Sequence, residues 1–227
     1  MINAKQAAGR RAAEFVEEGM TIGLGTGTTV FYTLEALAER VKDGLNIRGV
    51  PTSIDTEEKA REFGIPLVTL EEVHELDLTI DGADEIDGNF DMIKGGGGAL
   101  LREKVVARAS KRVVIVAGAD KVVDRLGIKF LLPIEVVPFA RHVIVRELKE
   151  LGGIPNLRLA DQGIVYLTDN GNEILDTHFQ AGIDDPAALE IRLASIPGVV
   201  ESGIFVGLAN VLVVGDDQGH ASVESRE

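Results

Sequence analysis

The sequence predicts an α/β fold: a Rossmann-like, mostly parallel sheet flanked by helices, with an inserted ferredoxin-like α+β subdomain of βαββαβ order. In the first half of the chain, short apolar runs alternate with stretches of helical periodicity, which is typical of βαβ units. The continuous apolar run within Arg112–Ala117 indicates a parallel strand buried on both faces. From about Leu132 the expected order changes to strand, helix, two strands, helix and strand, which is the ferredoxin-like arrangement.

Hydrophobic spacing and a capping residue place the elements of the first domain. Val30, Leu34 and Leu37 recur with the helical period, and Asp55 is placed to cap a charged surface helix. We expect helices over Ala4–Glu18, Thr29–Lys42, Thr56–Phe63 and Leu101–Ala109, and strands over Thr21–Leu24, Asn46–Ser53, Pro66–Leu70, Asp77–Asp81 and Arg112–Ala117.

The change of pattern also divides the chain into domains. We assign residues 1–131 and 208–227 to the Rossmann-like domain and residues 132–207 to the ferredoxin-like insert. A last strand over Val211–Val214 is expected to rejoin the first sheet, followed by a polar tail over Asp216–Glu227. Within the insert we expect strands over Ile134–Val137, Asn156–Leu159, Ile164–Asp169 and Val200–Val206, and helices over Ala140–Leu151 and Pro186–Ser195.

Composition excludes several classes of function. The 227 residues carry a net charge of −14, with 8 Phe and 2 Tyr, so nucleic acid and anionic membrane surfaces are unfavourable partners. No apolar run has the length of a membrane span and no signal-peptide pattern opens the chain, so we expect it to stay in the cytoplasm. With 0 Cys and 4 scattered His, the chemistry must come from carboxylates, amines, hydroxyls and backbone.

The first motif lies between an expected strand and an expected helix. Residues 23–29 read GLGTGTT, where backbone N–H groups and the helix dipole favour an anion and three threonine hydroxyls can donate to it. A tight turn with a threonine cap is the plain alternative, and a dinucleotide site is another. Thr28 and Thr29 interrupt the third-glycine spacing of the dinucleotide motif, so the turn favours a monophosphate.

The second motif is DGADEI at residues 81–86, at the carboxyl end of an expected parallel strand, where ligands bind in open α/β sheets. Asp81 and Asp84 flank Gly82 and can converge on one small polar molecule. A solvated acidic turn is the alternative without a function. A calcium loop is a third reading, but no register gives the required acidic spacing with a final Glu.

The third motif is KGGGGALLREK at residues 94–104. Successive glycines each cost roughly 0.5–1 kcal/mol relative to Ala, so their position before a helix indicates close approach of the backbone to a ligand. Their N–H groups can form an anion-binding nest to which Lys94 adds charge, and Glu103 lies about one turn into the helix. Lys121, after a buried strand, can neutralise a phosphate. Taken alone, Glu103 and Lys121 could each be ordinary surface residues.

Taken together, these motifs resemble the ribose-5-phosphate isomerase family of type A. The resemblance runs from about residue 4 to residue 214. It is carried by GTGTT at 25–29, TIDGADEI at 79–86, MIKGGGGALLREK at 92–104, ADK at 119–121 and TDNGNEILD at 168–176.

The resemblance implies an aldose–ketose isomerase that interconverts D-ribose 5-phosphate and D-ribulose 5-phosphate through an enediolate, in the non-oxidative pentose phosphate pathway. It implies no metal and no organic cofactor, a homodimer or dimer of dimers, and an insert that serves as lid and oligomerisation subdomain. Glu103 matches the proton-shuttling base, with Asp81, Asp84 and Lys94 as further catalytic groups. The substrate-binding residues implied are Thr26, Gly27, Thr28, Thr29, Asp81, Gly82, Ala83, Asp84, Lys94, Gly95, Gly96, Gly97 and Lys121.

Two other functions remain open from the sequence. Another sugar-phosphate enzyme, such as an amino-sugar deaminase or a lactonase, could use the same phosphate turn, although the pair of motifs at 81–84 and 94–103 disfavours it. A sugar-phosphate sensor would have no need of Glu103 and would normally carry a DNA-binding helix-turn-helix, for which this chain has neither room nor charge. Lys5 resembles a phosphate-contacting lysine of the family, but its local sequence does not assign it.

Overall fold

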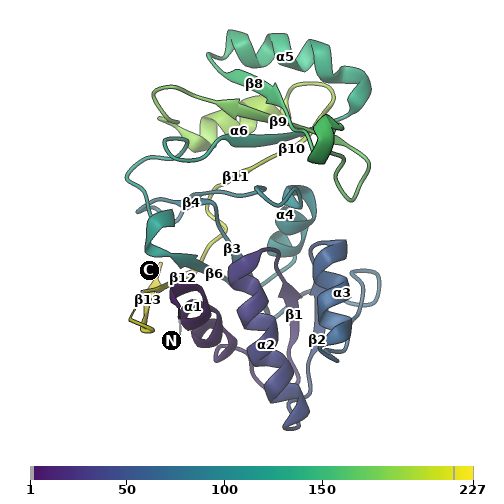
Figure 1. The fold of residues 1–227 in the computed structure, drawn as a ribbon, viewed down its shortest axis with the longest axis vertical. Helices are drawn as coiled ribbons and strands as arrows, with labels where there is room; N and C mark the ends of the chain where they lie inside the picture. The colour runs from purple at the N-terminus through teal and green to yellow at the C-terminus, as the bar shows by residue number, and fades with distance from the viewer. Residues whose placement is uncertain (1–2, 217, 227) are drawn as a thin grey trace. The chain divides into compact units, whose positions relative to one another are not determined.

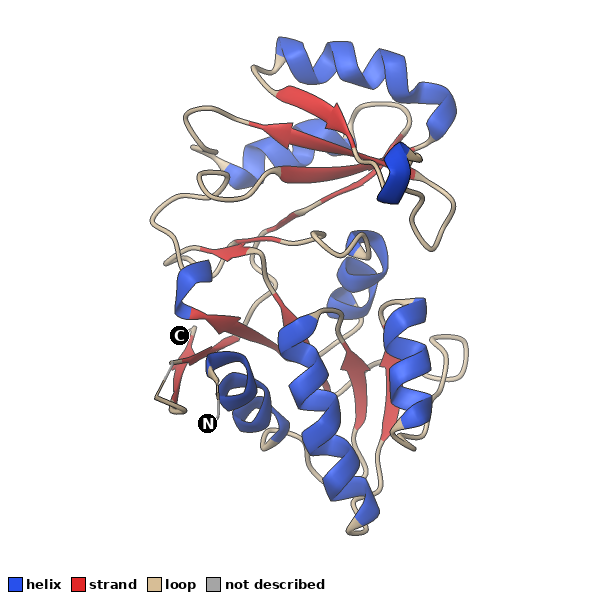
Figure 2. Ribbon diagram, viewed as in Figure 1, coloured by secondary structure: helices blue, strands red, loops and turns tan. Residues whose placement is uncertain are grey.

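The computed structural model describes residues 3–216 and 218–226, which form two compact units (Figures 1 and 2). The first unit comprises Met1–Ala83, Arg102–Val122 and Leu208–Glu227, and the second comprises Asp84–Leu101 and Val123–Gly207. The sequence places the division at residues 132–207, whereas here residues 84–101 and 123–131 also belong with the insert. No helix among the described residues has the length and apolar character needed to cross a membrane.

A six-stranded sheet forms the centre of the first unit. Strands β12, β6, β3, β1 and β2 are parallel, and only β13 runs antiparallel, against β12. The described strand order is β13 (Ala221–Ser225), β12 (Val211–Gly215), β6 (Val113–Gly118), β3 (Leu78–Gly82), β1 (Thr21–Leu24) and β2 (Arg48–Pro51). The Rossmann-like, mostly parallel sheet predicted from the sequence is thereby confirmed.

Helices cover both faces of this sheet. The helices are α1 (Ala4–Ala13), α2 (Thr28–Lys42), α3 (Ile54–Glu62) and α4 (Leu100–Arg108), of which α4 begins in the second unit. Ile22 and Leu24 of β1 pack in one core with Leu34 and Leu37 of α2. An added Cβ at Gly23, between them, would lie 2.5 Å from Val106 of α4, so alternate residues of β1 face opposite helical layers.

The carboxyl ends of β1, β3 and β6 meet at one edge of the parallel sheet. Leu24 pairs with Ile80, and Asp81 pairs with Ile115 in the next strand. The segments that leave these strands are therefore neighbours: the threonine turn after β1, Asp81–Ala83 at the end of β3, and the short 3₁₀ helix η1 (Ala119–Lys121) after β6. This edge is where open α/β sheets bind their ligands.

The second unit contains the predicted ferredoxin-like sheet. Its four strands are antiparallel in the order β10 (Val199–Ser202), β7 (Leu132–Val136), β9 (Glu173–His178) and β8 (Ile154–Leu157). Helices α5 (Arg141–Glu150) and α6 (Pro186–Ala194) share its apolar core, and the 3₁₀ helices η2 (Pro138–Ala140) and η3 (Asp161–Gly163) lie in its connections.

A small three-stranded sheet in the second unit was not predicted. It consists of β11 (Ile204–Phe205), β5 (Met92–Ile93) and β4 (Glu85–Ile86). Glu85, fully buried, accepts backbone hydrogen bonds from Gly127, Lys129 and Phe130 at 2.5, 2.5 and 2.7 Å. This carboxylate fixes the connection that enters the ferredoxin-like sheet.

Several expected elements differ from the structure. The expected strand at Pro66–Leu70 is reduced to one bridge between Leu67 and Gly49. Helix α3 is capped by Ser53, whose side chain accepts from the N–H of Thr56, whereas Asp55 lies inside the helix. Helix α1 ends at Ala13, five residues before the expected end at Glu18.

Two errors concern strands in the C-terminal half. Ile164–Asp169 is not a strand, although its first four residues are consecutive apolar or aromatic ones, because Ile164 and Leu167 are exposed and make no ladder. The third strand of the insert is instead β9, whose Ile174 and Leu175 are buried. The expected polar tail after Asp216 contains the described strand β13, which pairs with β12.

Candidate active site

The threonine turn of the first unit is fastened to Asp81. The N–H of Gly25 donates to the carbonyl of Ile80 at 2.9 Å, and the N–H of Thr26 donates to Oδ1 of Asp81 at 3.1 Å. An added Cβ at Gly25 would lie 2.3 Å from the same carboxylate oxygen, so only glycine permits this approach. Asp81 is 2% exposed, and its carboxylate is held in place by the turn.

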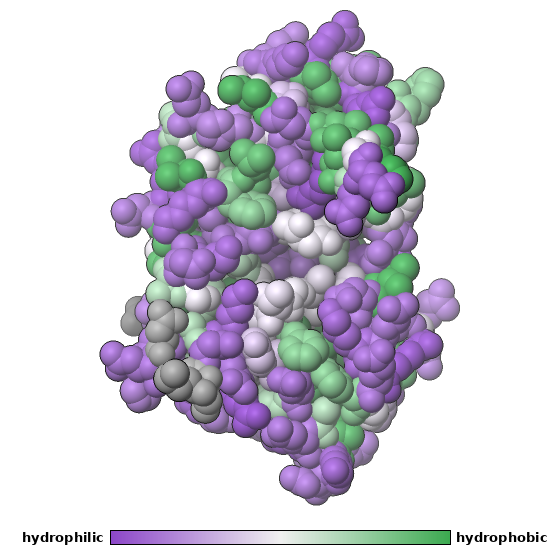
Figure 3. Space-filling model, in the orientation of Figure 1, coloured by the Kyte–Doolittle hydropathy of each residue, from purple (hydrophilic) through white to green (hydrophobic). Residues whose placement is uncertain are grey.

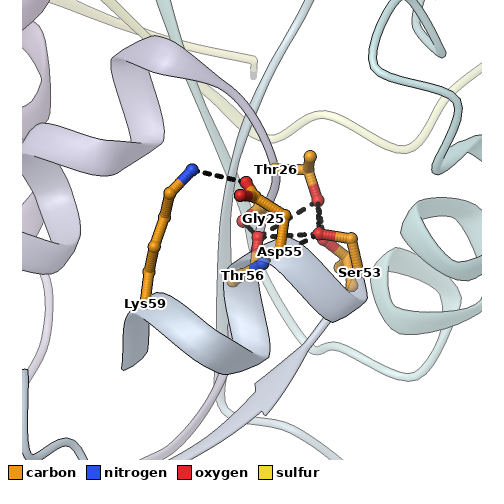
Figure 4. A network of polar contacts seen from close by, with 7 residues as sticks. Gly25, Thr26, Ser53, Asp55, Thr56 and Lys59 are labelled. Atoms are coloured by element: carbon orange, nitrogen blue, oxygen red, sulfur yellow. Dashed lines mark hydrogen bonds and ion pairs between the residues drawn. The ribbon is translucent and has the colours of Figure 1, made fainter. Parts of the chain in front are cut away.

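The hydroxyl of Thr26 belongs to a buried polar network (Figure 4). It lies 2.8 Å from Oγ1 of Thr52 and donates to Oγ of Ser53 at 2.9 Å, while Thr56 donates to the carbonyl of Gly25 at 2.8 Å. The sequence suggests that three threonine hydroxyls can donate to a ligand. In the structure that of Thr26 is engaged by its neighbours and secures the turn.

Helix α2 presents its N-terminus to the end of this turn. Its N-cap residue, Gly27, has a φ of 113° and supplies no side-chain cap. Lys5 of α1 donates from Nζ to Oγ1 of Thr28 at 2.8 Å. A helix N-terminus with two threonine hydroxyls and a lysine amine is a site that favours a phosphate. The structure therefore places Lys5 against Thr28, a contact that its local sequence alone does not indicate.

Glu103 and Lys121 complete the set of candidate residues in the first unit. Glu103 lies in the first turn of α4 and is only 5% exposed, so it is not the ordinary surface residue that the flanking charges suggest. A carboxylate in the first turn is favoured by the helix dipole. Lys121 ends η1, its side chain is partly exposed, and its Nζ lies 3.9 Å from Oδ2 of Asp120.

Asp84 and Lys94 lie together in the second unit because β4 and β5 pair. The N–H of Asp84 donates to the carbonyl of Ile93 at 2.8 Å, and the N–H of Lys94 donates to the carbonyl of Gly203 at 2.9 Å. Lys94 is 3% exposed, and its Nζ lies 5.6 Å from the ring centroid of Phe205. The amine of Lys94 is therefore shielded from solvent.

The glycine run after Lys94 holds the carboxylate of Asp84. Gly95 and Gly98 have φ angles of 100° and 79°, which only glycine adopts readily. The N–H of Gly96 donates to Oδ2 of Asp84 at 2.7 Å. An added Cβ at Gly96 would lie 2.7 Å from Oδ1 of Asp84, so this glycine is required by contact with the carboxylate.

Two residues that sequence reasoning missed fasten the glycine run through its carbonyl groups. Arg158 donates from Nη1 to the carbonyls of Gly95 and Gly96 at 2.9 and 3.1 Å. Tyr166 donates to the carbonyl of Gly97 at 3.3 Å, and burial raises the pKa of its hydroxyl, which therefore stays protonated. No local signal marks either residue, because both contacts span more than sixty residues of sequence.

The acidic turn between β4 and β5 is not arranged as a calcium loop. Oδ1 of Asp87 accepts from the N–H groups of Asn89 and Asp91, at 2.9 and 3.0 Å, and Glu85 is engaged by backbone. Within the described ranges, no three His, Asp or Glu side chains gather as they would around a metal ion.

The predicted residues thus fall into two groups, each set within its own unit. Thr26, Gly27, Thr28, Thr29, Asp81, Gly82, Ala83, Glu103 and Lys121 belong to the first unit, and Asp84, Lys94, Gly95, Gly96 and Gly97 belong to the second. A helix N-terminus without a side-chain cap, buried carboxylates and a buried lysine on an α/β fold are typical of enzymes that act on small phosphorylated metabolites.

Comparison with known proteins narrows this class to one family. The model of ribose 5-phosphate isomerase A (phosphoriboisomerase A) matches residues 48–219. Ribose-5-phosphate isomerase A of Listeria innocua is 50% identical over 98% of this chain and 99% of its own. A solved D-ribose-5-phosphate isomerase in complex with phospho-erythronic acid superposes with a TM-score of 0.95 at 39% identity, covering 99% of this chain and 100% of that one. The enzyme of Plasmodium falciparum gives 0.94 at 39% identity, with 98% of each chain covered.

The chain belongs to the ribose 5-phosphate isomerase A family. It is an aldose–ketose isomerase that interconverts D-ribose 5-phosphate and D-ribulose 5-phosphate. The family resemblance and the activity expected from the sequence are confirmed.

Proposed function

We propose that Glu103 is the base that carries the proton in this isomerisation. The observation that carries the proposal is a carboxylate buried to 5% exposure in the first turn of α4, in the motif that follows the glycine run. The reaction removes a proton from C2 of the aldose and returns one to C1, so a single carboxylate can act first as base and then as acid. The intermediate is an enediolate.

We assign to Lys94 and the glycine run the stabilisation of the negative charge that develops on the enediolate oxygen. A buried ammonium and backbone N–H groups stabilise an enediolate because they are already oriented when the charge forms. The 3% exposure of Lys94 supports this role, since few water molecules can screen its charge.

We assign binding of the substrate's phosphate to residues of the first unit. The uncapped N-terminus of α2, the hydroxyls of Thr28 and Thr29, and Lys121 complement a dianion, and Lys5 adds its amine through Thr28. Thr26 and Gly27 form the turn that leads into α2, and Gly82 and Ala83 lie at the carboxyl end of the neighbouring strand β3.

The carboxylates of Asp81 and Asp84 are assigned to the sugar hydroxyls and to opening of the cyclic sugar. Each is held by a backbone N–H, that of Thr26 for Asp81 and that of Gly96 for Asp84. A fixed carboxylate accepts from a hydroxyl without loss of side-chain freedom on binding.

We further propose that this chain binds phospho-erythronic acid, the ligand named for the solved relative. Its planar carboxylate resembles an enediolate, and its phosphate suits the same anion site. Such a compound should compete with ribose 5-phosphate and bind more tightly than the substrate.

The cytoplasmic location, the metal independence and the homodimer or dimer of dimers stay predictions, as does a lid and oligomerisation role for residues 132–207. Exposed apolar side chains in this segment support the oligomer: Phe139 is 98% exposed, and Ile191 is 73% exposed. Figure 3 shows apolar patches among the hydrophilic residues of one face. Sedimentation equilibrium of the chain and of Phe139→Asp would measure the oligomer, which the variant should weaken.

The function is tested by incubating purified chain with ribose 5-phosphate in the presence of EDTA. Ribulose 5-phosphate should form, and the reverse reaction should reach the same equilibrium mixture. Unphosphorylated ribose serves as the control and should react poorly. Loss of activity with EDTA that returns on adding a divalent cation would contradict metal independence, and no reaction in either condition would contradict the proposal.

A further inference from the structure

Arg158 makes contacts that the proposed mechanism does not use. It follows β8, where its backbone N–H donates to the carbonyl of Ile174 at 2.9 Å. Its Nε and Nη2 donate to the two carboxylate oxygens of Asp176 on β9, at 2.8 and 2.5 Å. Both side chains are largely buried, with 13% and 19% exposed. A bidentate pair of this kind fixes the plane of the guanidinium.

The remaining nitrogen of this guanidinium points to the glycine run. Nη1 donates to the carbonyl of Gly95 at 2.9 Å and to that of Gly96 at 3.1 Å. The ring of Tyr166 lies 5.7 Å from the guanidinium carbon, measured to the ring centroid, and its hydroxyl donates to the next carbonyl, that of Gly97. Three consecutive carbonyls of the run are thus held by these two side chains.

One peptide group joins Arg158 to Asp84. The carbonyl of Gly95 and the N–H of Gly96 belong to the same planar peptide, in which they point in opposite directions. Arg158 donates to the carbonyl, and the N–H donates to Oδ2 of Asp84 at 2.7 Å. Hydrogen bonds in such a chain polarise one another, so a cation on the carbonyl strengthens the bond to the carboxylate.

We propose that Arg158, oriented by Asp176, is a positioning residue that acts on the reaction through the Gly95–Gly96 peptide and the carboxylate of Asp84. The proposal rests on the catalytic role proposed above for Asp84. Lysine cannot replace Arg158 fully, because one ammonium lacks the planar fork that reaches a carboxylate and two carbonyls together.

The test is a double-mutant cycle on kcat with Arg158→Met and Asp84→Ala. Arg158→Met should lower kcat about 10-fold or more in the native background and less than about 2-fold when Asp84 is already Ala, because coupled residues are not additive. Arg158→Lys should recover part of the loss. Arg141→Met is the matched control. Arg141 of α5 forms an ion pair with Glu173 of β9, the strand that also carries Asp176, and does not contact the glycine run. It should lower kcat less than about 2-fold in both backgrounds.

The outcomes separate the inference from the proposed function. If Arg158→Met lowered kcat by the same factor in both backgrounds, the proposed action of Arg158 through Asp84 would be overturned. The role of Asp84 itself would not be affected. If Asp84→Ala alone kept kcat within about 3-fold of the native value, the catalytic role of Asp84 would be contradicted. The proposed action of Arg158 through Asp84 would then be contradicted too. Should Arg158→Met not fold, Asp176→Asn keeps the arginine but loosens it, and the same cycle with Asp84→Ala decides in the same way.

Discussion

Two glycine turns lead into helices in this protein, and they are built in different ways. The turn at residues 25–27 is fastened by short side chains that are close in the fold of its own unit, among them Ser53 and Asp81. The run at residues 95–98 is fastened by Arg158 and Tyr166, which lie in the connection between β8 and β9, more than sixty residues further along the chain.

The two turns also differ in what their backbone N–H groups can bind. The first turn ends at a helix without a side-chain cap, so its N–H groups can receive an anion. The second turn directs the N–H of Gly96 to a carboxylate of the protein itself. We therefore expect changes at the first turn to act mainly on binding of the phosphate, and changes at the second to act mainly on turnover.

The largest effect is expected in the helix that follows the second turn. Glu103→Gln keeps the shape of the side chain and removes its basicity, so kcat should fall by about 10²–10⁴-fold while substrate still binds. Steady-state kinetics with ribose 5-phosphate give both constants. A variant within about 3-fold of the native rate would remove Glu103 from the role of base.

Lys94→Met is expected to come next. It removes a buried positive charge and keeps most of the bulk, so kcat should fall by about 10²-fold or more without loss of the fold. Circular dichroism and thermal unfolding check the fold on the same sample. If turnover is retained, the stabilising charge lies elsewhere, and Lys121 is the next candidate.

Gly96→Ala tests the contact between the second turn and Asp84. The added Cβ must displace the carboxylate, whereas the φ of Gly96 is not positive, so activity should fall about 10-fold or more with little change in stability. Gly88→Ala is the matched control, because an added Cβ there meets nothing within 4 Å. An active Gly96→Ala enzyme that merely melts earlier would show that the glycine serves the turn alone.

The smallest effect is expected from a change at a residue proposed to bind the phosphate. Lys121→Ala should raise the KM for ribose 5-phosphate by about 3–10-fold and leave the poor binding of unphosphorylated ribose unchanged, because a partly exposed charge is screened. Lys42→Ala, an exposed lysine at the other end of α2, is the control. Equal weakening of both sugars would mean that Lys121 does not contact the phosphate.

The same two turns show how far sequence reasoning reaches. The threonine turn and Asp81 could be predicted because both follow strands of a parallel sheet, whose carboxyl ends must meet at one edge. The fastening of the glycine run could not be predicted, because the Asp176 that orients Arg158 lies on β9, which pairs with β8. The sequence places this third strand of the insert at Ile164–Asp169 rather than at Glu173–His178. Lys5 likewise becomes visible only when α1 is packed beside α2.

Proton transfer by Glu103 is tested most directly by isomerisation in deuterium oxide. The native chain should place solvent deuterium on C1 of ribulose 5-phosphate, detected by NMR, because the proton carried by a carboxylate exchanges with solvent. Glu103→Gln, folded and still binding phospho-erythronic acid, should incorporate deuterium at an initial rate at least about 10²-fold lower than that of the native chain. Deuterium at C1 at a comparable rate in the variant would contradict the account, because another group would then be moving the proton.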